Sequence, residues 1–261
     1  MSVSLSSIFN VLKKIGLLLL LAAIYPACRP PEEDKGTTLL VAAASDLVKA
    51  LPELGRDFEV RTGSSSGVKI VPSFGASGIL ARQIAHGAPF DVFLSADRRH
   101  IEELARDGRV EVGSRRVYAR GRLVLWSAKL SVSSLEDLRR PEVQRISMAN
   151  PGYAPYGAAA RQALEKAGLW PQVAPKVVVA ESIRHALEMA ESGNVEVAMT
   201  ALSLAPAGGS TWLVPESLHD PIEQEAAIVK PSSRAQKFLK YLTSPAARTI
   251  LKKYGFTFPA T

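Results

Sequence analysis

Two serine residues stand where predicted β-strands give way to helices. Ser45 follows an apolar run at residues 39–43, and Ser77 follows an extended stretch at residues 68–73. Such β-to-α turns line up along the carboxyl edge of an open parallel sheet, where ligands bind. A helix start there presents unpaired backbone N–H groups and the positive end of a dipole, and a serine hydroxyl adds a further donor. The two turns therefore predict a binding site for an anion.

An ordinary structural role for the two serines stays open at this point. Serine is a favoured N-cap residue, so either hydroxyl could simply cap its own helix. The neighbouring residues, Ala42 to Ala44 and Gly75 with Ala76, are small. Because small residues let the backbone approach a compact ligand closely, the surroundings of both turns favour the anion site.

A hydrolase pattern also occurs in the chain. Residues 63–67, GSSSG, match the G-x-S-x-G nucleophile elbow, which requires a strand before it and a helix after it. Here a helix is predicted before the segment and a strand after it, so we interpret it as a flexible turn. The single cysteine and the four histidines, at positions 86, 100, 185 and 219, show no paired metal-ligand spacing. We therefore expect neither an enzyme nor a protein-coordinated metal.

Short apolar strands alternate with amphipathic helices along the chain, which indicates parallel sheets. A first set comprises strands 39–43, 68–73 and 91–95 and helices 46–58, 77–85 and 97–106. A second set comprises strands 122–126, 145–149, 176–179 and 195–199 and helices 156–167 and 182–191. Strand 225–229 and helix 232–242 follow, and Ser244 is expected to cap a last helix that ends before Gly255. Pro52 is expected to kink the helix at 46–58.

The composition bounds the class of protein. The chain has 261 residues, of which 47% are hydrophobic, so it can bury one large core or two modest ones. Its formal net charge of +7 is spread as short arginine pairs without interleaved aromatic residues. This pattern is typical of a solvated surface and does not indicate a nucleic-acid partner.

The N-terminus has the features of an export signal. Lys13 and Lys14 precede an apolar run at residues 15–24, which is too short to span a bilayer but suits a secretory signal. Cys28 is the only cysteine and cannot form an internal disulfide. Its context resembles a bacterial lipoprotein cleavage site, although Tyr25 stands where such sites usually have leucine. Lipidation of Cys28 and ordinary cleavage nearby, leaving a free thiol, both stay open.

Four stretches of the chain resemble one known family. They are LLVAAASDL, PSFGASGILARQIAHGAPFDVFLSAD, APYGAAARQALEKAGLW and FLKYLTSPAARTILKKYGF. They look like the periplasmic molybdate-binding proteins of bacterial ABC importers, and the resemblance covers nearly the whole exported chain. It implies an α/β fold of the two-lobed periplasmic-binding-protein type, with a mostly parallel sheet flanked by helices in each lobe. The lobes would close over an oxyanion by a hinge motion.

The same resemblance implies a division of the chain. Residues 1–28 are assigned to a signal peptide and residues 29–37 to a linker. Residues 38–119 and 224–261 would form the first lobe, and residues 120–223 would form the second. The chain would therefore cross twice between the lobes.

The family's oxyanion-binding positions fall on residues of both lobes. In the first lobe they fall on Ser45 and Ser77, the serines identified above from their turns. In the second lobe they fall on Tyr156 and Ile183, each near a predicted helix start. Ile183 could act only through its backbone N–H, because its side chain is apolar.

Two further positions bear on the expected site. Many family members have a tyrosine where this chain has Thr200, and we expect Tyr156 to supply a hydroxyl from across the cleft instead. The Asp46 carboxylate would repel a dianion if it pointed inward. We therefore expect at most a backbone N–H contact from Asp46, with stabilisation of a helix N-terminus as the simpler role of its side chain.

The chemistry of the ligand indicates what the site must contain. Molybdate and tungstate are doubly charged and unprotonated at neutral pH, so a selective site offers hydrogen-bond donors and few acceptors. Several converging neutral dipoles can offset the burial of such a charge. Hydrogen phosphate needs an acceptor, whose absence would exclude it. Sulfate shares the charge and the tetrahedral shape of molybdate, so a binding protein for sulfate stays the alternative.

The resemblance also implies partners and a location. A membrane permease and an ATPase would receive the ligand from the closed lobes. We expect a monomeric binding protein without a cofactor, in the periplasm or on the outer face of the cell envelope. Contact with the membrane itself would come only through a lipid on Cys28.

Overall fold

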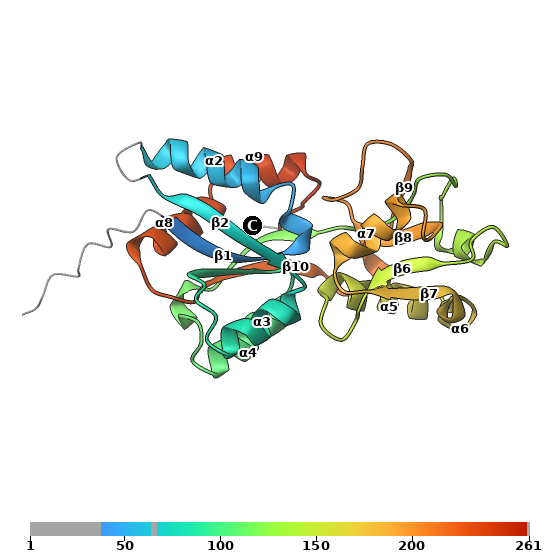
Figure 1. Cartoon of the computed structure of the whole chain (residues 1–261), viewed down its shortest axis with the longest axis horizontal. Coiled ribbons are helices and arrows are strands. Elements are labelled where there is room, and N and C mark those ends of the chain that lie inside the picture. The colour runs from blue at the N-terminus through green and yellow to red at the C-terminus, as the bar shows by residue number, and fades with distance from the viewer. Residues whose placement is uncertain (1–37, 64–66, 260–261) are drawn as a thin grey trace, which may run out of the picture. The chain divides into compact units, whose positions relative to one another are not determined.

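Two five-stranded sheets, one in each of two lobes, organise the part of the chain that the computed structural model describes, residues 38–63 and 67–259 (Figure 1). The chain crosses between the sheets twice, once after residue 121 and once between residues 213 and 222. The predicted signal peptide, the linker and Cys28 lie outside the described residues.

The first sheet consists, in spatial order, of β2 (Lys69–Gly75), β1 (Thr38–Ala44), β3 (Val92–Ser95), β10 (Ile222–Ile228) and β4 (Arg116–Gly121). β1 is parallel to both β2 and β3. β10 is antiparallel to both of its neighbours, β3 and β4. Four of the five strands therefore point the same way, and β10 alone is reversed.

Helices cover both faces of this first sheet (Figure 1). One face carries α2 (Leu51–Thr62), α8 (Ser233–Leu242) and α9 (Pro245–Lys253), and the other carries α3 (Ser77–Ala85) and α4 (Arg99–Arg106). Leu51, Leu54 and Phe58 recur at helical spacing and are buried with Phe238 of α8. The apolar stripe of each helix thus determines which face of the sheet it covers.

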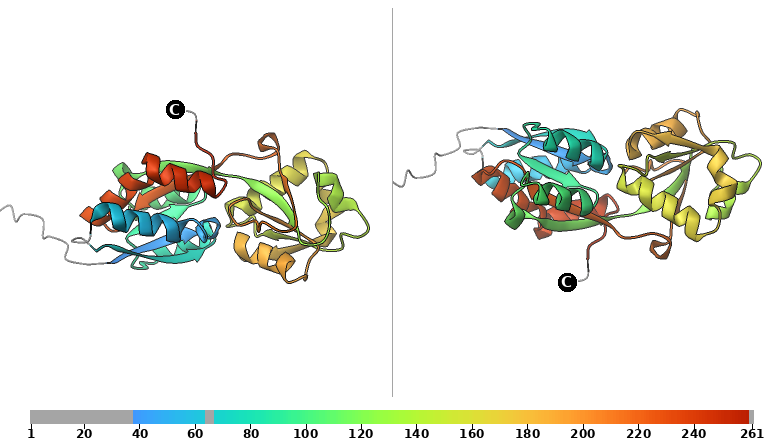
Figure 2. Two further views of the ribbon diagram at one scale, coloured as in Figure 1. Left: turned by 90° about the horizontal axis from the view of Figure 1, so that it is seen from above. Right: turned by 90° about the horizontal axis from the view of Figure 1, so that it is seen from below.

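The second sheet consists, in spatial order, of β7 (Val177–Ala180), β6 (Ile146–Ala149), β8 (Val197–Ala201), β5 (Leu123–Ser127) and β9 (Ser210–Leu213). β6 is parallel to β7 and β8, whereas β5 is antiparallel to β8 and β9. α7 (Ile183–Glu191) lies on one face, and α5 (Pro155–Lys166) with α6 (Trp170–Val173) lies on the other (Figure 2). The short 3-10 helices of the chain are η1 (Ser45–Leu47), η2 (Val112–Ser114), η3 (Leu135–Arg139), η4 (Ala174–Lys176) and η5 (Glu216–Leu218).

The two sheets have the same topology. Their strand orders match position by position, and the one reversed strand, β10 or β5, occupies the same place in each. β1 and β2 lead into η1 and α3, and β6 and β7 lead into α5 and α7. Because parallel strands end at a common edge, each sheet presents two equivalent turns at one edge.

The predicted two-lobed α/β fold is confirmed, with the sheets mostly parallel in strand direction but mixed because of β10 and β5. The expected kink at Pro52 is wrong. η1 ends at Leu47, and α2 begins anew at Leu51 with Pro52 in its first turn, where the missing N–H removes no hydrogen bond.

Two strands, β4 and β9, were not predicted, nor were the short helix α6 and the 3-10 helices η2 to η5. β4 and β9 are edge strands of their sheets, and neither shows a continuous apolar run. The last helix, in contrast, starts and ends as predicted. Ser244 accepts a hydrogen bond from the Ala247 N–H, and Gly255, with φ of 81°, follows its end.

The structure also bears on the enzyme patterns considered above. α2 precedes and β2 follows residues 63–67, which is the reverse of the order that a nucleophile elbow requires. In the described part of the chain, no group of three or more metal-ligating side chains comes together. None of the helices within those residues combines the length and the apolar character needed to cross a bilayer.

Gly157 allows α5 to lie directly against β6. A Cβ atom at this position would overlap the backbone carbonyl of Ala149, which cannot rotate away. We expect Gly157→Ala to lower the free energy of unfolding by about 1–3 kcal/mol, as overpacking does, in chemical denaturation. Gly113→Ala is the control, because nothing lies within 4 Å of the Cβ position there. Equal stability of the two variants would contradict the close packing of α5 on β6.

Candidate functional site

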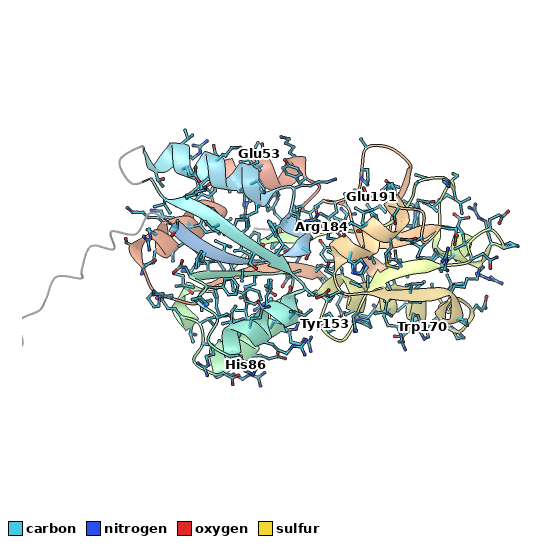
Figure 3. The ribbon with its side chains drawn as sticks, in the orientation of Figure 1. Glu53, His86, Tyr153, Trp170, Arg184 and Glu191 are labelled. Carbon is cyan, nitrogen blue, oxygen red and sulfur yellow. The ribbon has the colours of Figure 1, made fainter. Side chains whose placement is uncertain are left out.

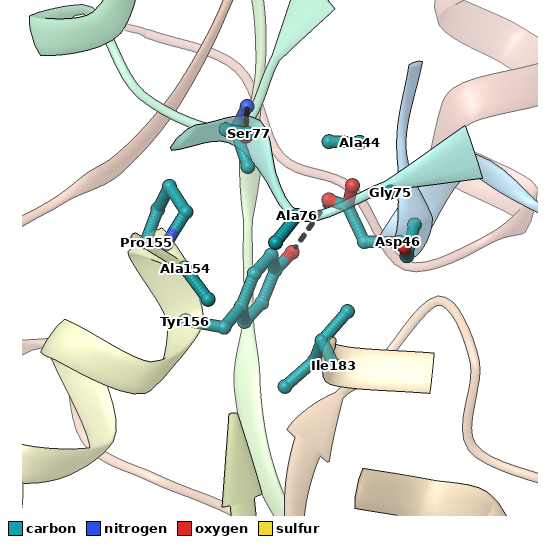
Figure 4. A pocket seen from close by; sticks show the side chains of 11 residues that line it. Ala44, Asp46, Gly75, Ala76, Ser77, Ala154, Pro155, Tyr156 and Ile183 are labelled. Atoms are coloured by element: carbon teal, nitrogen blue, oxygen red, sulfur yellow. Dashed lines mark hydrogen bonds between the residues drawn. The ribbon is translucent and has the colours of Figure 1, made fainter. Parts of the chain in front are cut away.

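One pocket receives a turn from each of β1, β2, β6 and β7 (Figure 4). The residues that line it are Ala44, Ser45, Asp46, Gly75, Ala76, Ser77, Ala96, Ala154, Pro155, Tyr156 and Ile183. All five residues that the sequence analysis singled out for ligand contact are among them. The structure therefore brings together residues of both lobes, and the first and last of them, Ala44 and Ile183, are more than 130 positions apart in the chain.

Neither serine caps its own helix, so the capping interpretation is wrong for both. The N-cap positions of η1 and α3 are Ala44 and Ala76, and no side chain caps either helix. The Ser77 hydroxyl oxygen accepts a hydrogen bond of 3.0 Å from the Ala96 N–H, which leaves the hydroxyl proton of Ser77 available to donate. The Ser45 side chain is buried at the pocket wall.

The second lobe contributes two helix starts to the pocket. Pro155 is in the first turn of α5, and Tyr156 follows it. Ser182 caps α7 by accepting a hydrogen bond of 3.1 Å from the His185 N–H, and Ile183 is the first residue of that helix. Because the first N–H groups of a helix have no partner within it, the Ile183 N–H can serve a ligand.

The side chain of Asp46 lies at the pocket rather than away from it. It is fully buried, and its Oδ2 accepts a hydrogen bond of 2.9 Å from the Tyr156 hydroxyl (Figure 4). The same oxygen accepts one of 2.8 Å from the Gln224 amide. The other carboxyl oxygen, Oδ1, has no hydrogen-bond partner among the described residues. The expected role at a helix N-terminus fails because Asp46 sits in a helix of only three residues. Its carboxyl group instead joins the two lobes.

Burial governs the protonation of this cluster. Burial raises the pKa of the Asp46 carboxyl to about 7, and the hydrogen bonds from Tyr156 and Gln224 offset part of the rise. Burial, together with the nearby charge of Asp46, also raises the pKa values of Tyr118 and Tyr156 well above the ordinary tyrosine value. Both phenols therefore remain protonated donors at neutral pH, whereas Asp46 is divided between its two protonation states.

Gln224 is a member of this cluster that sequence reasoning missed. It lies in β10 between two glutamates that form ion pairs. Glu223 pairs with Arg120 of β4, and Glu225 pairs with Arg115, the residue before β4. Gln224 is fully buried and is not part of these ion pairs. One uncharged polar residue between two glutamates in a strand is the signal that could have found it.

Gly121 makes room for the contact between Tyr156 and the first lobe. A Cβ atom at Gly121 would overlap the Tyr156 hydroxyl and would lie 3.1 Å from the Gln224 amide nitrogen. Gly121 is not among the glycines with positive φ, so packing rather than backbone conformation requires glycine here.

Thr200 does not line the pocket. It is buried in β8, and its hydroxyl donates a hydrogen bond of 3.3 Å to the Ile183 carbonyl. This contact holds the first residue of α7, so Thr200 acts on the pocket only through the position of Ile183.

The two lobes touch around the pocket. Ser203 donates a hydrogen bond of 2.7 Å to the Asp46 carbonyl, and the Gly78 N–H donates one of 2.8 Å to the Tyr153 carbonyl. The Lys49 ammonium group donates to the Leu204 carbonyl. These contacts hold the two lobes together around a small pocket.

Among the described residues, none of those that line the pocket is a lysine or an arginine. The groups that could bind an anion are hydroxyls and helix-start N–H groups, which carry no full charge. Asp46 adds one acceptor to this set of donors when it is ionised. The arrangement can therefore hold an anion by hydrogen bonds alone.

The family model of bacterial extracellular solute-binding proteins matches residues 39–257. The chain belongs to this family. Among the relatives of this solute-binding protein, the molybdate-binding protein ModA of Azotobacter vinelandii is 39% identical over 226 residues, which cover 83% of the chain and 88% of the relative. The molybdate-binding protein ModA of Rhodobacter capsulatus is 36% identical over 224 residues, with coverage of 84% and 87%.

A solved structure agrees with these matches. The periplasmic molybdate-binding protein of Azotobacter vinelandii aligns with this solute-binding protein at a TM-score of 0.80 and 34% sequence identity. The alignment covers 85% of the chain and 100% of the solved structure. The two-lobed fold and the family resemblance seen in the sequence are both confirmed.

The pKa of Asp46 makes the stability of the protein depend on pH. In the unfolded chain an aspartate titrates near pH 3.9, so between about pH 4 and 7 the folded state keeps a proton that the unfolded state releases. Stability from this group is therefore lost as the pH rises through that range. Asp46→Asn lacks this loss. We therefore expect the free energy of unfolding of the variant, minus that of the wild type, to increase by about 4 kcal/mol from pH 4 to pH 8.

Denaturant unfolding at a series of pH values measures this difference. The exposed Asp107 supplies the matched control, and Asp107→Asn should follow the wild-type curve. A curve for Asp46→Asn that runs parallel to the wild type would show that Asp46 titrates normally in the folded protein.

Proposed function

We propose that the chain is the extracytoplasmic binding component of an ABC importer for molybdate. Ser45 and Ser77 of the first lobe and Tyr156 and Ile183 of the second contact the oxyanion, and the backbone N–H of Asp46 is a further candidate donor. The observation that carries the proposal is the convergence of β-to-α turns from both sheets, three from the first and two from the second, on a pocket whose described lining residues include no lysine or arginine. The names of the relatives support molybdate as the ligand and a binding protein rather than an enzyme. Tungstate, with the same charge and shape, is proposed as a second ligand.

Neutral donors are sufficient for tight binding when enough of them converge. A hydrogen bond to a charged group contributes roughly 1.5–3 kcal/mol net. About five to seven such bonds exceed the roughly 8 kcal/mol that a micromolar dissociation constant requires, even after the cost of ordering and closure. The serine hydroxyls and the helix-start N–H groups are the donors at the pocket, and the Tyr156 hydroxyl joins them when it is not donating to Asp46.

The position of Asp46 alters the argument against phosphate. The sequence predicts a site without an acceptor, yet an ionised Asp46 at the pocket could accept the hydrogen of hydrogen phosphate. Sulfate, with the charge and shape of molybdate, is the alternative ligand. Phosphate and sulfate therefore both belong in the binding test beside molybdate and tungstate.

The proposal includes how the protein is exported and what it works with. Residues 1–28 form the signal and residues 29–37 a linker, and the lobes comprise residues 38–119 with 224–261 and residues 120–223. The mature protein acts as a monomer in the periplasm or on the outer face of the envelope. It delivers the oxyanion to a membrane permease with its ATPase and needs no cofactor.

Removal of a serine hydroxyl tests the site. We expect Ser45→Ala and Ser77→Ala each to weaken molybdate binding at least several-fold, since each loses one donor to a charged ligand. Titration calorimetry with molybdate, tungstate, sulfate and phosphate measures the affinities and their order. Ser147→Ala is the matched control, because Ser147 is buried but donates to the Ala186 carbonyl, away from the pocket. Unchanged affinity in both pocket variants would refute the site, and tighter binding of sulfate would favour the alternative.

Mass spectrometry of the mature N-terminus tests the export proposal. A mature chain that begins at Cys28 and carries the added mass of acyl chains is the expected result for a lipoprotein. A Cys28→Ser variant should lose that mass and appear in the soluble fraction. A mature chain that begins elsewhere with an unmodified Cys28 would rule out the lipid anchor.

A further inference from the structure

Asp46 places a buried carboxyl group beside a pocket proposed for a dianion. Its side chain has no exposed surface, and its Oδ2 already accepts hydrogen bonds from Tyr156 and Gln224. Its Oδ1 is buried and makes no hydrogen bond to any described residue. If Asp46 were ionised, three negative charges would share one poorly solvated space, which is strongly unfavourable.

The groups that face Asp46 from the neighbouring elements do not neutralise it. Tyr118 of β4, Tyr156 of α5 and Gln224 of β10 surround its carboxyl group, and none of them carries a positive charge. Tyr118 is linked to the cluster through its hydroxyl, which donates a hydrogen bond of 3.4 Å to the Gln224 side-chain oxygen. Ser203, after β8, contacts only the Asp46 backbone carbonyl.

The cations and acids of the adjoining elements have other partners or face solvent. Lys49, close to Asp46 in sequence, donates to the Leu204 and Ala205 carbonyls. Arg184 lies on α7 (Figure 3) and pairs with Glu188. His185 beside it is exposed. The glutamates on either side of Gln224 pair with Arg120 and Arg115. No described cation is therefore placed to balance an ionised Asp46.

The Tyr156 hydroxyl has a single hydrogen, which it donates to Asp46 Oδ2. The same hydrogen cannot be donated to an oxyanion at the same time. A neutral Asp46 removes this conflict, because its acid O–H can donate in turn and no longer requires the hydrogen of Tyr156. Protonation of Asp46 thus converts the pair from a competitor of the ligand into a source of donors.

We propose that this protein binds its dianion together with one proton, and that Asp46 takes up that proton. The inference rests on the proposed function and assigns Asp46 as the residue that sets the charge of the complex. A proton from solvent forms an O–H bond at Asp46 Oδ1, and no bond of the oxyanion breaks. The bound state then contains a neutral carboxylic acid, which donates a hydrogen bond, and an unprotonated oxyanion.

The test measures proton uptake during binding of molybdate to the intact exported protein. Titration calorimetry is run at pH 6, 7, 8 and 9 in pairs of buffers with different ionisation enthalpies, so the buffer-dependent heat counts the protons. Since the protonated form binds and burial raises the pKa of Asp46 to about 7, uptake should rise from about 0.1 proton at pH 6 to about 0.9 at pH 8. The affinity should fall about tenfold for each pH unit above 7.

Two variants separate the proton from the hydrogen bonds. Asp46→Asn should bind molybdate without proton uptake and with an affinity that no longer falls above pH 7. Ser77→Ala, from the same pocket, should bind more weakly at every pH but keep the wild-type slope. Thermal unfolding of each variant checks that it folds, and the buffer comparison on the wild type needs no variant.

The outcomes are distinct. Wild-type binding whose heat at pH 8 is the same in both buffers, with an affinity independent of pH, would overturn the proton uptake and leave the proposed function standing. A pH slope that persists in Asp46→Asn would assign the proton to another group and overturn the role of Asp46. Failure to bind molybdate at any pH would overturn the proposed function and this inference with it.

Discussion

The hydrogen bond from Tyr156 to Asp46 joins the two lobes at the point where their strand ends meet. Both groups are buried, so the bond forms in a region where electrostatic interactions are strong and unpaired polar groups are costly. Gln224 extends the contact into β10, a strand next to one of the two chain crossings. The closed arrangement of the lobes, the protonation of the carboxyl group and the donors left for a ligand are therefore not independent properties.

The duplicated topology explains how the pocket can bind an anion without positively charged side chains. Each sheet places two turns at the carboxyl edge of its parallel strands, and the lobes bring these edges face to face. The turns supply backbone N–H groups at the starts of α3, α5 and α7, which are fixed by the helices themselves. Fixed donors need little reorganisation when an anion arrives, whereas long cationic side chains would have to be ordered.

Much of the fold and part of the site could be predicted from the sequence, because both depend on local signals. Apolar periodicity defined most helices and strands, and small residues with serine marked the turns after β1 and β2. The edge strands β4 and β9 escaped because neither has a continuous apolar run: half of the β4 residues are buried, and none of the β9 residues is. The direction of the Asp46 side chain also escaped, since it depends on Tyr156 and Gln224, which lie 110 and 178 positions away in the chain.

Gly121 connects the crossing between the lobes with the chemistry of the pocket. It is the last residue of β4, and the space that its missing side chain leaves is taken by the Tyr156 hydroxyl. A methyl group there would displace the phenol from the carboxyl group. The segment that connects the lobes is thus constrained by the shape of the binding site as well as by its own backbone. A substitution made only to stiffen the connection would also change the acid–phenol pair, so effects on lobe motion and on ligand affinity cannot be varied separately at this residue.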